Sequence, residues 1–412
     1  MTSKTILRIN VFLAFLLAAG IASFLLNHLT PHPVGLAGLP PGLLLTTTAP
    51  ATRQATPLPA GNNPSPAASS TPFVPKSVPT VIHAIRADYT DMAASRSQVK
   101  PLEQAIQESG FNLVSLGAGR AEWTYFKWSG HTAQWSSDVK STGVDFLAED
   151  SGRFGAWAHV DAAVDVLSPL YIQQHPEAAA ISLDGTPSPN LVSTMQLVEG
   201  PYGQQLLDMI TAIASGYPVD SISVNELAYH LDGYGPDDKS AYLAYSRRTD
   251  WPRLPNGAIN PDDPGLVTWR SYEVNRFLGQ ARDIAHRYGK SFYANLTLAL
   301  GPDGLPLSTD LAAIQALNSV SDRVILWNNL NLSQVTSQQL ARVADALAPV
   351  DHNRVIFVIG LWGQPTTQPI TPLQLQSAMQ VLQQHGFANL WITPASLMTT
   401  AHWQAAAAGW MP

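Results

Sequence analysis

From residue 80 onward, short apolar runs of the chain alternate with longer stretches of helical character. The eight apolar runs are Thr80–Ala87, Phe111–Ala118, Phe154–Val160, Val219–Glu226, Ser291–Thr297, Arg323–Asn328, Arg354–Ile359 and Asn389–Thr393. Strands that alternate with helices form parallel sheets, and eight such units are the number that closes a barrel. We therefore expect residues 80–412 to fold as one α/β domain, a (β/α)8 TIM barrel.

Helices are predicted between several of these strands. They are Gln98–Ser109, Gly203–Ala214, Thr268–Tyr288, Leu311–Ser319, Ser333–Leu347 and Pro372–His385. Gly110, Gly289 and Gly386 lie where helix C-caps are expected. A doubly wound open sheet is the alternative arrangement, but Gly117-Ala118-Gly119 lacks the third glycine of its phosphate-binding turn. The barrel is therefore the preferred prediction.

The first 28 residues have the pattern of an export signal. Lys4 and Arg8 precede the uncharged run Val11–Leu26, whose length lies between that of a signal-peptide core and that of a short membrane helix. The run ends in Phe24, Leu25 and Leu26, which make a poor cleavage site. We expect an uncleaved single-pass membrane anchor, with the rest of the chain outside the cytoplasm. Secretion after cleavage is the alternative.

Residues 29–79 have the composition of a disordered linker. They hold twelve of the 32 prolines of the chain, and their only charged residues are Arg53 and Lys76. Such a segment cannot bury enough apolar surface to offset the entropy lost on ordering. We expect an extended tether between the anchor and the barrel.

Charge and residue content exclude several classes of function. The net charge of −7, with only 23 Lys and Arg residues, argues against a nucleic-acid partner. The chain contains no cysteine, which excludes disulfides, thiolate metal sites and a cysteine nucleophile. No Gly-x-Ser-x-Gly nucleophile motif occurs, and His159 with Asp161 alone is a weak metal-binding pattern. We expect no metal and no cofactor.

Polar and aromatic residues collect where the predicted strands end. In chain order they are Asp88, Tyr89, His159, Asp161, Asn225, Glu226, His230, Asp232, Tyr293, Asn295, Trp327, Asn328 and Trp362. The carboxyl ends of the strands form the face on which TIM barrels place their chemistry. Acids and amides that meet sugar hydroxyls, together with rings that stack on sugar faces, suit a carbohydrate cleft. The sequence therefore predicts a polysaccharide or oligosaccharide partner.

Several short motifs resemble those of bacterial glycosyl-hydrolase-like barrel proteins. The motifs are Gly143–Asp150, Ala156–His159, His175–Glu177, Asp184-Gly185, Tyr217–Ile222 and Trp269–Phe277. Over roughly residues 80–395 the chain is similar to glycoside-hydrolase-like family ten and, more remotely, to the hydrolase half of exopolysaccharide-processing proteins. The resemblance implies a barrel that acts on or binds glycans.

The chain departs from that family at one decisive position. The family strand usually ends in aspartate where this chain has Asn225, and the carboxylate here has moved to Glu226. One hypothesis is a surface-anchored glycoside hydrolase with Glu226 as general acid and Asp161 or Asp88 as the second carboxylate. The other is a non-catalytic barrel that binds cell-envelope glycan for adhesion or assembly.

Overall fold

The computed structural model describes residues 77–88, 96–227, 232–298, 300–301, 303–328, 332, 335–363 and 368–410. The predicted anchor, nearly all of the predicted linker, Tyr89 and His230 lie outside these residues. Within the described ranges, no helix combines the length and the apolar character that crossing a membrane requires.

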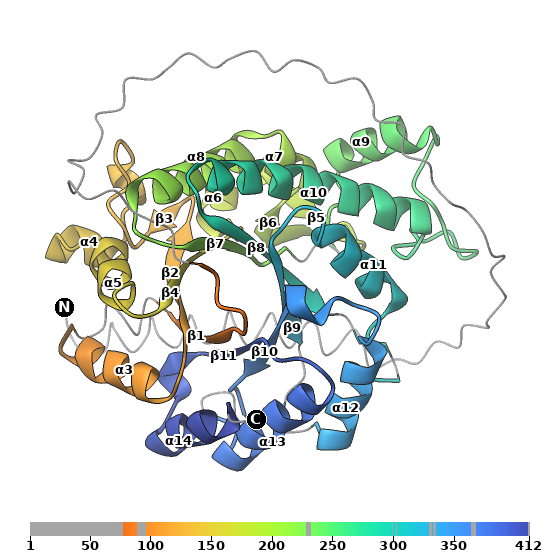
Figure 1. The fold of residues 1–412 in the computed structure, drawn as a ribbon. Coiled ribbons are helices and arrows are strands. Elements are labelled where there is room, and N and C mark those ends of the chain that lie inside the picture. The colour runs from red at the N-terminus through yellow and green to blue at the C-terminus, as the bar shows by residue number, and fades with distance from the viewer. Residues whose placement is uncertain are drawn as a thin grey trace. The chain divides into compact units, whose positions relative to one another are not determined.

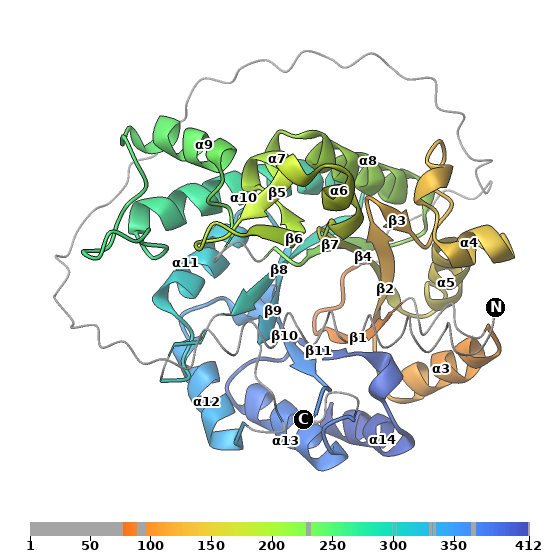
Figure 2. The same cartoon turned by 180° about the vertical axis from the view of Figure 1, so that it is seen from behind.

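Eight parallel strands form a closed barrel (Figures 1 and 2). They are β1 (His83–Ala87), β2 (Leu113–Arg120), β4 (His159–Asp165), β7 (Ser221–Asn225), β8 (Ser291–Leu298), β9 (Arg323–Asn328), β10 (Val355–Gly360) and β11 (Leu390–Thr393). Strand β1 pairs with both β2 and β11, so the sheet closes on itself. This closure confirms the predicted barrel and excludes the open sheet.

A helix follows each barrel strand and packs around the outside of the barrel (Figure 1). These helices are α3 (Arg96–Glu108), α5 (Phe146–Phe154), α8 (Pro201–Gly216), α10 (Pro264–Arg287), α11 (Ser308–Leu317), α12 (Ser337–Ala346), α13 (Pro372–Gln384) and α14 (Thr400–Gly409). Gly110, Gly289 and Gly386 adopt positive φ angles of 77°, 70° and 89° just after α3, α10 and α13, as expected for C-caps.

Shorter elements occupy the loops that leave the carboxyl ends of β2, β4 and β7. They are β3 (Trp123–Thr124), α4 (Ser137–Thr142), α6 (Pro169–Gln174), β5 (Ala179–Ile181), β6 (Pro187–Val192), α7 (Thr194–Val198) and α9 (Pro236–Ser246). They lie outside the eight strands and six helices predicted above. They enlarge the mouth of the barrel, the end at which the parallel strands finish.

The position predicted for the third strand was wrong. We expected a strand over Phe154–Val160, but Phe154 is the last residue of α5, and β4 begins only at His159. Leu147 and Phe154 are buried by the packing of α5 on the barrel. That packing explains the apolar signal, and the correction moves His159 and Asp161 from the mouth to the opposite half of β4.

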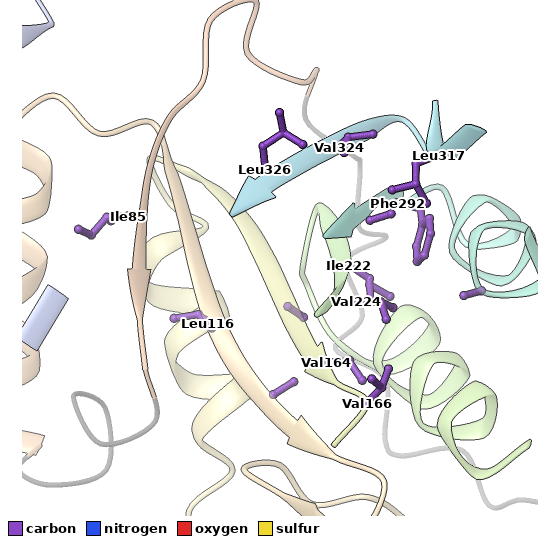
Figure 3. Packing of buried hydrophobic residues seen from close by; sticks show 14 of the residues in the cluster. Ile85, Leu116, Val164, Val166, Ile222, Val224, Phe292, Leu317, Val324 and Leu326 are labelled. Carbon is purple, nitrogen blue, oxygen red and sulfur yellow. The ribbon is translucent and has the colours of Figure 1, made fainter. Parts of the chain in front are cut away.

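Side chains alternate along each strand between the helical layer and the barrel interior. In β7, Ile222 and Val224 pack outward with Phe292 in the main apolar core (Figure 3). The neighbouring Ser221, Ser223 and Asn225 point the other way, into the barrel, because successive strand residues face opposite sides. Elsewhere the interior is filled by apolar residues such as Ile325, Ile356 and Trp391.

Candidate active site

The barrel mouth gathers polar side chains from five consecutive strands. At or near the carboxyl end of each strand stand Arg86 on β1, Arg120 on β2, Asp165 on β4, Asn225 on β7 and Asn295 on β8. The strand register places Arg120 opposite Asp165 and Asp165 opposite Asn225. The sheet itself therefore brings these groups together.

Two arginines share the carboxylates of this cluster. Arg86 Nε lies 2.8 Å from Asp88 Oδ1, and Arg86 Nη2 lies 3.7 Å from Asp165 Oδ1. Arg120 Nε approaches the other oxygen of Asp165 at 3.9 Å. Because guanidinium groups lie near both of its oxygens, the carboxylate of Asp165 is held in one orientation.

Two asparagines extend the network around the barrel. The side-chain amide of Asn295 donates to Asn225 Oδ1 at 3.0 Å, and that of Asn225 donates to Asp165 Oδ1 at 3.2 Å. Both asparagines are buried. The chain of hydrogen bonds from β8 through β7 to β4 thus fixes Asp165 from the side opposite to Arg120.

A β-bulge in β2 sets the position of Arg120. The register between β2 and β4 shifts between Gly117 and Gly119. Gly119 has φ 112°, and a Cβ there would lie 2.3 Å from the carbonyl oxygen of Trp123. Only glycine fits this position, which allows β2 to turn into the short antiparallel strand β3 directly after Arg120.

Glu226 follows β7 in a left-handed backbone conformation with φ 66°. This conformation costs a residue other than glycine roughly 1–2 kcal/mol, and such positions cluster at functional sites. Glu226 is exposed to solvent, yet neighbouring protein atoms restrict the hydration of its carboxyl. Restricted hydration, together with repulsion from Asp165, raises the pKa of its carboxyl, and Arg86 and Arg120 oppose that rise.

Two tryptophans stand on β9 and just after β10. The ring centroids of Trp327 and Trp362 are 5.9 Å apart, with an interplanar angle of 32°. Both rings are partly exposed. The ring of Trp362 packs against Gly360, where a Cβ would lie 2.9 Å from Trp362 Cε3. Such a pair can stack on the apolar face of a sugar ring.

Asp161 does not belong to the mouth. It is fully buried in the barrel interior, four residues before Asp165 on β4. The hydroxyls of Ser115, Ser221 and Ser223 donate to its carboxylate at 2.8, 3.0 and 2.7 Å. Burial raises its pKa, and the three serines oppose the rise. These contacts give Asp161 a structural position where we had predicted a catalytic one.

His159 and Tyr293 also lie away from the predicted cleft. His159 is buried at the amino end of β4, with Nδ1 3.9 Å from Asp220 Oδ2. Tyr293 is fully buried and packs in the barrel interior with Ile325 and Trp391. Both are enclosed below the mouth, so the structure does not bring them together with the residues gathered there.

Two further predictions have separate outcomes. Asp232 interacts with Arg270 on α10 and with Asp184 in the β5–β6 hairpin, and burial raises its pKa. It therefore belongs to the wall built by the insertions. Tyr89 and His230 lie outside the described residues, and so does the side chain of Asn328.

The residue predictions assigned no role to Arg86, Arg120 or Asp165. A period-two pattern could have revealed Asp165, because Asp161, Ala163 and Asp165 share one face of β4 once the strand begins at His159. Arg86 stands between the buried apolar residues Ile85 and Ala87 of β1, which is a second signal. Within the described residues, no cluster of three or more histidines and acids could hold a metal ion.

Solved structures similar to this chain include several glycoside hydrolases. The glycoside hydrolase domain of PgaB (BpsB) from Bordetella bronchiseptica has 16% identity and a TM-score of 0.55 over 80% of this chain and 98% of its own. The catalytic domain of β-amylase from Paenibacillus polymyxa has 11% identity and a TM-score of 0.53 over 79% of this chain and 95% of its own. For β-galactosidase from Marinomonas ef1 the values are 12% and 0.58, over 79% of this chain and 58% of its own.

The comparisons support the coarser part of the sequence-based resemblance. The chain matches no protein-family model and no curated protein, so family ten stays a prediction. At identities this low, structural likeness shows the fold alone. The described part of the chain is therefore a glycoside-hydrolase-like (β/α)8 barrel.

Proposed function

We propose that this barrel hydrolyses glycosidic bonds of a polysaccharide or oligosaccharide, with Glu226 as general acid and Asp165 as the second carboxylate. One observation carries the proposal: two carboxyl groups from adjacent strands interact electrostatically at the mouth but have different surroundings. Arginines and an amide hold Asp165, whereas Glu226 lies at the end of the cluster. Pairs of carboxyls in contrasting environments are the usual basis of acid and base roles in glycosidases.

The two roles follow from these surroundings. The raised pKa of Glu226 favours the protonated form, which can donate to the glycosidic oxygen as the bond to the leaving sugar breaks. Asp165 then faces the positive charge that develops on the sugar ring. A separation of about 5–5.5 Å between the carboxyls would make Asp165 a nucleophile, and about 6.5–9.5 Å would make it the base that activates water.

A non-catalytic glycan-binding barrel is the second candidate. The Trp327–Trp362 pair favours it, because stacking on a sugar requires no proton transfer. The described residues that follow β10, from Leu361 to Gly363, also contain no carboxylate. In this role the charged cluster would orient hydroxyl groups only.

A panel of soluble polysaccharides distinguishes the two candidates. Release of reducing ends by the wild-type protein, abolished in a Glu226→Gln/Asp165→Asn double variant that still binds the same glycan, would support hydrolysis. Glycan binding by the wild type without release of reducing ends would favour the binding barrel. Neither binding nor release with any glycan would contradict both.

We also propose that residues 1–28 anchor the protein in a membrane. The support is the uncharged run Val11–Leu26 behind Lys4 and Arg8. The full-length protein should then sediment with membranes and resist extraction by carbonate. Recovery of a soluble product whose N-terminus lies beyond residue 22 would identify a cleaved signal instead.

A further inference from the structure

A pocket lies at the base of the barrel, the end at which the strands begin. Its volume is about 640 Å³, and its lining includes Lys290, Arg323 and Arg354 from the amino ends of β8, β9 and β10, together with His286 at the end of α10. The candidate active site uses none of these residues. The pocket is therefore a separate feature of the fold.

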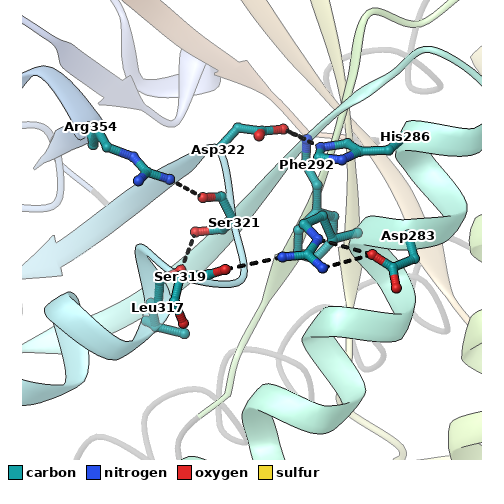
Figure 4. Close-up of polar contacts among 9 residues, drawn as sticks. Asp283, His286, Phe292, Leu317, Ser319, Ser321, Asp322 and Arg354 are labelled. Carbon is teal, nitrogen blue, oxygen red and sulfur yellow. Dashed lines mark hydrogen bonds and ion pairs between the residues drawn. The ribbon is translucent and has the colours of Figure 1, made fainter. Parts of the chain in front are cut away.

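One acid, Asp322, faces these four basic residues in the pocket lining. The same oxygen of Asp322 accepts from the backbone N–H of Phe292 at 2.8 Å and lies 2.8 Å from His286 Nε2 (Figure 4). The carboxylate of Asp322 thus contacts His286 at the end of α10 and not the arginines. Lys290 is buried, its ammonium donates to the carbonyl of Tyr217 at 3.4 Å, and it lies within electrostatic range of Asp220. No carboxylate in the lining forms an ion pair with Arg323 or Arg354.

Arg323 and Arg354 are held by backbone carbonyls. Arg354 Nη2 donates to the carbonyl of Ser321, in the loop before β9 (Figure 4). Arg323 Nη1 donates to the carbonyl of Asn353, just before β10. Each arginine thus secures the loop that precedes its neighbour's strand. Across the described residues, neither forms an ion pair with a carboxylate, so both keep a full positive charge in a fixed position.

The residues that precede β1 contain no acid that could pair with Arg323 and Arg354. Val78 also lines the pocket, so the polypeptide passes this site on its way into β1. No aspartate or glutamate occurs before Asp88. An anion that neutralises the arginines must therefore come from outside this segment.

We propose that the pocket at the barrel base binds a phosphoryl group through Arg323, Arg354 and Lys290. Two guanidinium groups in fixed positions suit a tetrahedral oxyanion, since each can donate paired N–H groups to separate oxygens. The pocket is large enough for a phosphate ester and not just the free ion. The phosphoryl group comes from a soluble or glycan-linked ester or from a lipid headgroup, and the site chemistry is the same for both.

Calorimetric titration of the full-length protein with inorganic phosphate and with glycerol 3-phosphate tests the site. We expect saturable binding by the wild type and a loss of at least about tenfold in affinity in Arg323→Gln/Arg354→Gln, because charged hydrogen bonds contribute that much. Arg323→Lys/Arg354→Lys should lose less, since it keeps both charges. Arg342→Gln, an exposed change on α12, is the matched control and should bind as the wild type does.

Vesicle flotation separates the two sources. Stronger flotation with phosphatidylglycerol than with phosphatidylcholine alone, lost in the glutamine double variant, would assign the phosphoryl group to a lipid. Equal flotation with phosphate binding intact would assign it to a soluble or glycan-linked ester. Residues 1–28 are the same in both proteins, so their own membrane affinity cancels.

A measurement on the wild type covers the case in which the glutamine variant fails to fold. Phosphate should slow the modification of Arg323 and Arg354 by phenylglyoxal, as read by peptide mapping, while Arg342 reacts at an unchanged rate. Equal reaction rates with and without phosphate, or no saturable binding at millimolar phosphate, would overturn the proposal. So would a folded glutamine double variant that binds phosphate as tightly as the wild type.

Discussion

The two ends of the barrel both carry arginines, but the arginines have different partners. At the mouth, Arg86 and Arg120 contact the carboxylates of Asp88 and Asp165. At the base, Arg323 and Arg354 contact backbone carbonyls. A carbonyl positions a guanidinium without cancelling its charge, whereas a carboxylate does both.

This difference separates what each end can do. The mouth holds its own acids in register with cations, so the charges of its arginines are balanced within the protein. The base has an excess of positive charge and needs an anion from elsewhere. The same residue type therefore indicates chemistry at one end and recognition at the other, and variants that alter one end should leave the other unchanged.

The largest effect is expected for Glu226→Gln. The amide keeps the shape of the side chain but has no proton to donate, so hydrolysis should fall by roughly two to four orders of magnitude while glycan binding survives. In the wild type, the alkaline limb of the kcat/KM profile should lie above pH 4.5, the usual glutamate value, because the pKa of Glu226 is raised. Wild-type rates in the variant would mean that the acid lies elsewhere.

Asp165→Asn should lower hydrolysis by about a hundredfold or more if Asp165 is the second carboxylate. The replacement keeps the side-chain size and a hydrogen-bond acceptor for Asn225, so the mouth should stay assembled. Rates measured with a single glycan in both variants would show whether Asp165 and Glu226 act as a unit. An Asp165→Asn protein as active as the wild type would break the proposed pairing.

Asp161→Asn tests the residue that the sequence wrongly placed at the mouth. Asparagine has one acceptor oxygen for three serine donors, so the variant should lose about 1–3 kcal/mol of unfolding free energy. Its kcat per folded molecule should stay close to that of the wild type. Chemical denaturation and active-site titration measure the two quantities, and a hundredfold loss of kcat with unchanged stability would restore Asp161 to a catalytic role.

Trp362→Ala should weaken glycan affinity by about 1 kcal/mol or more, because one stacking surface of the mouth is lost. Tyr272→Ala, an exposed aromatic on α10, serves as the matched control. Affinity electrophoresis with the bound glycan compares the two. Equal retention of both variants would count against the hypothesis that the mouth binds glycans. Phosphate binding at the base should be unaffected in either variant.

Lys290 at the barrel base should make the free energy of unfolding depend on pH. Burial lowers the pKa of Lys290 to about 8, against a usual value of 10.5. Between these two pH values the unfolded chain retains a proton that the folded protein has released, so stability should rise with pH across this window. Because the pocket is open to water, we expect a gain on the order of 1 kcal/mol. Urea denaturation should show the slope in the wild type and not in Lys290→Met.

The sequence predicted the architecture well because barrel strands carry a strong local signal. All eight strands exist, and β9 was predicted with its observed bounds. The third strand failed because the apolar face of α5 and the start of β4 follow each other closely, and hydrophobicity alone does not separate a helix end from a strand. That error displaced His159 and Asp161 to the wrong end of the barrel.

The site was only partly predictable from the sequence. Glu226 and Asn225 follow a clear apolar strand, so their place at the mouth could be inferred. The partners of Asp165 come from β1, β2 and β7, more than 40 residues away on either side, and only the closed register brings them together. The bulge at Gly119, which directs Arg120 toward Asp165, has no signature beyond a single glycine.

Gly360 determines the orientation of the Trp362 ring at the mouth. The indole of Trp362 packs directly against the backbone of Gly360, so its position depends on the lack of a side chain at residue 360. Any larger residue at this position would push the indole to a new tilt while leaving Asp165 on β4 and Glu226 after β7 in place. If the mouth binds glycans as proposed, a library confined to position 360 should change the preferred sugar while the proposed catalytic pair keeps its position.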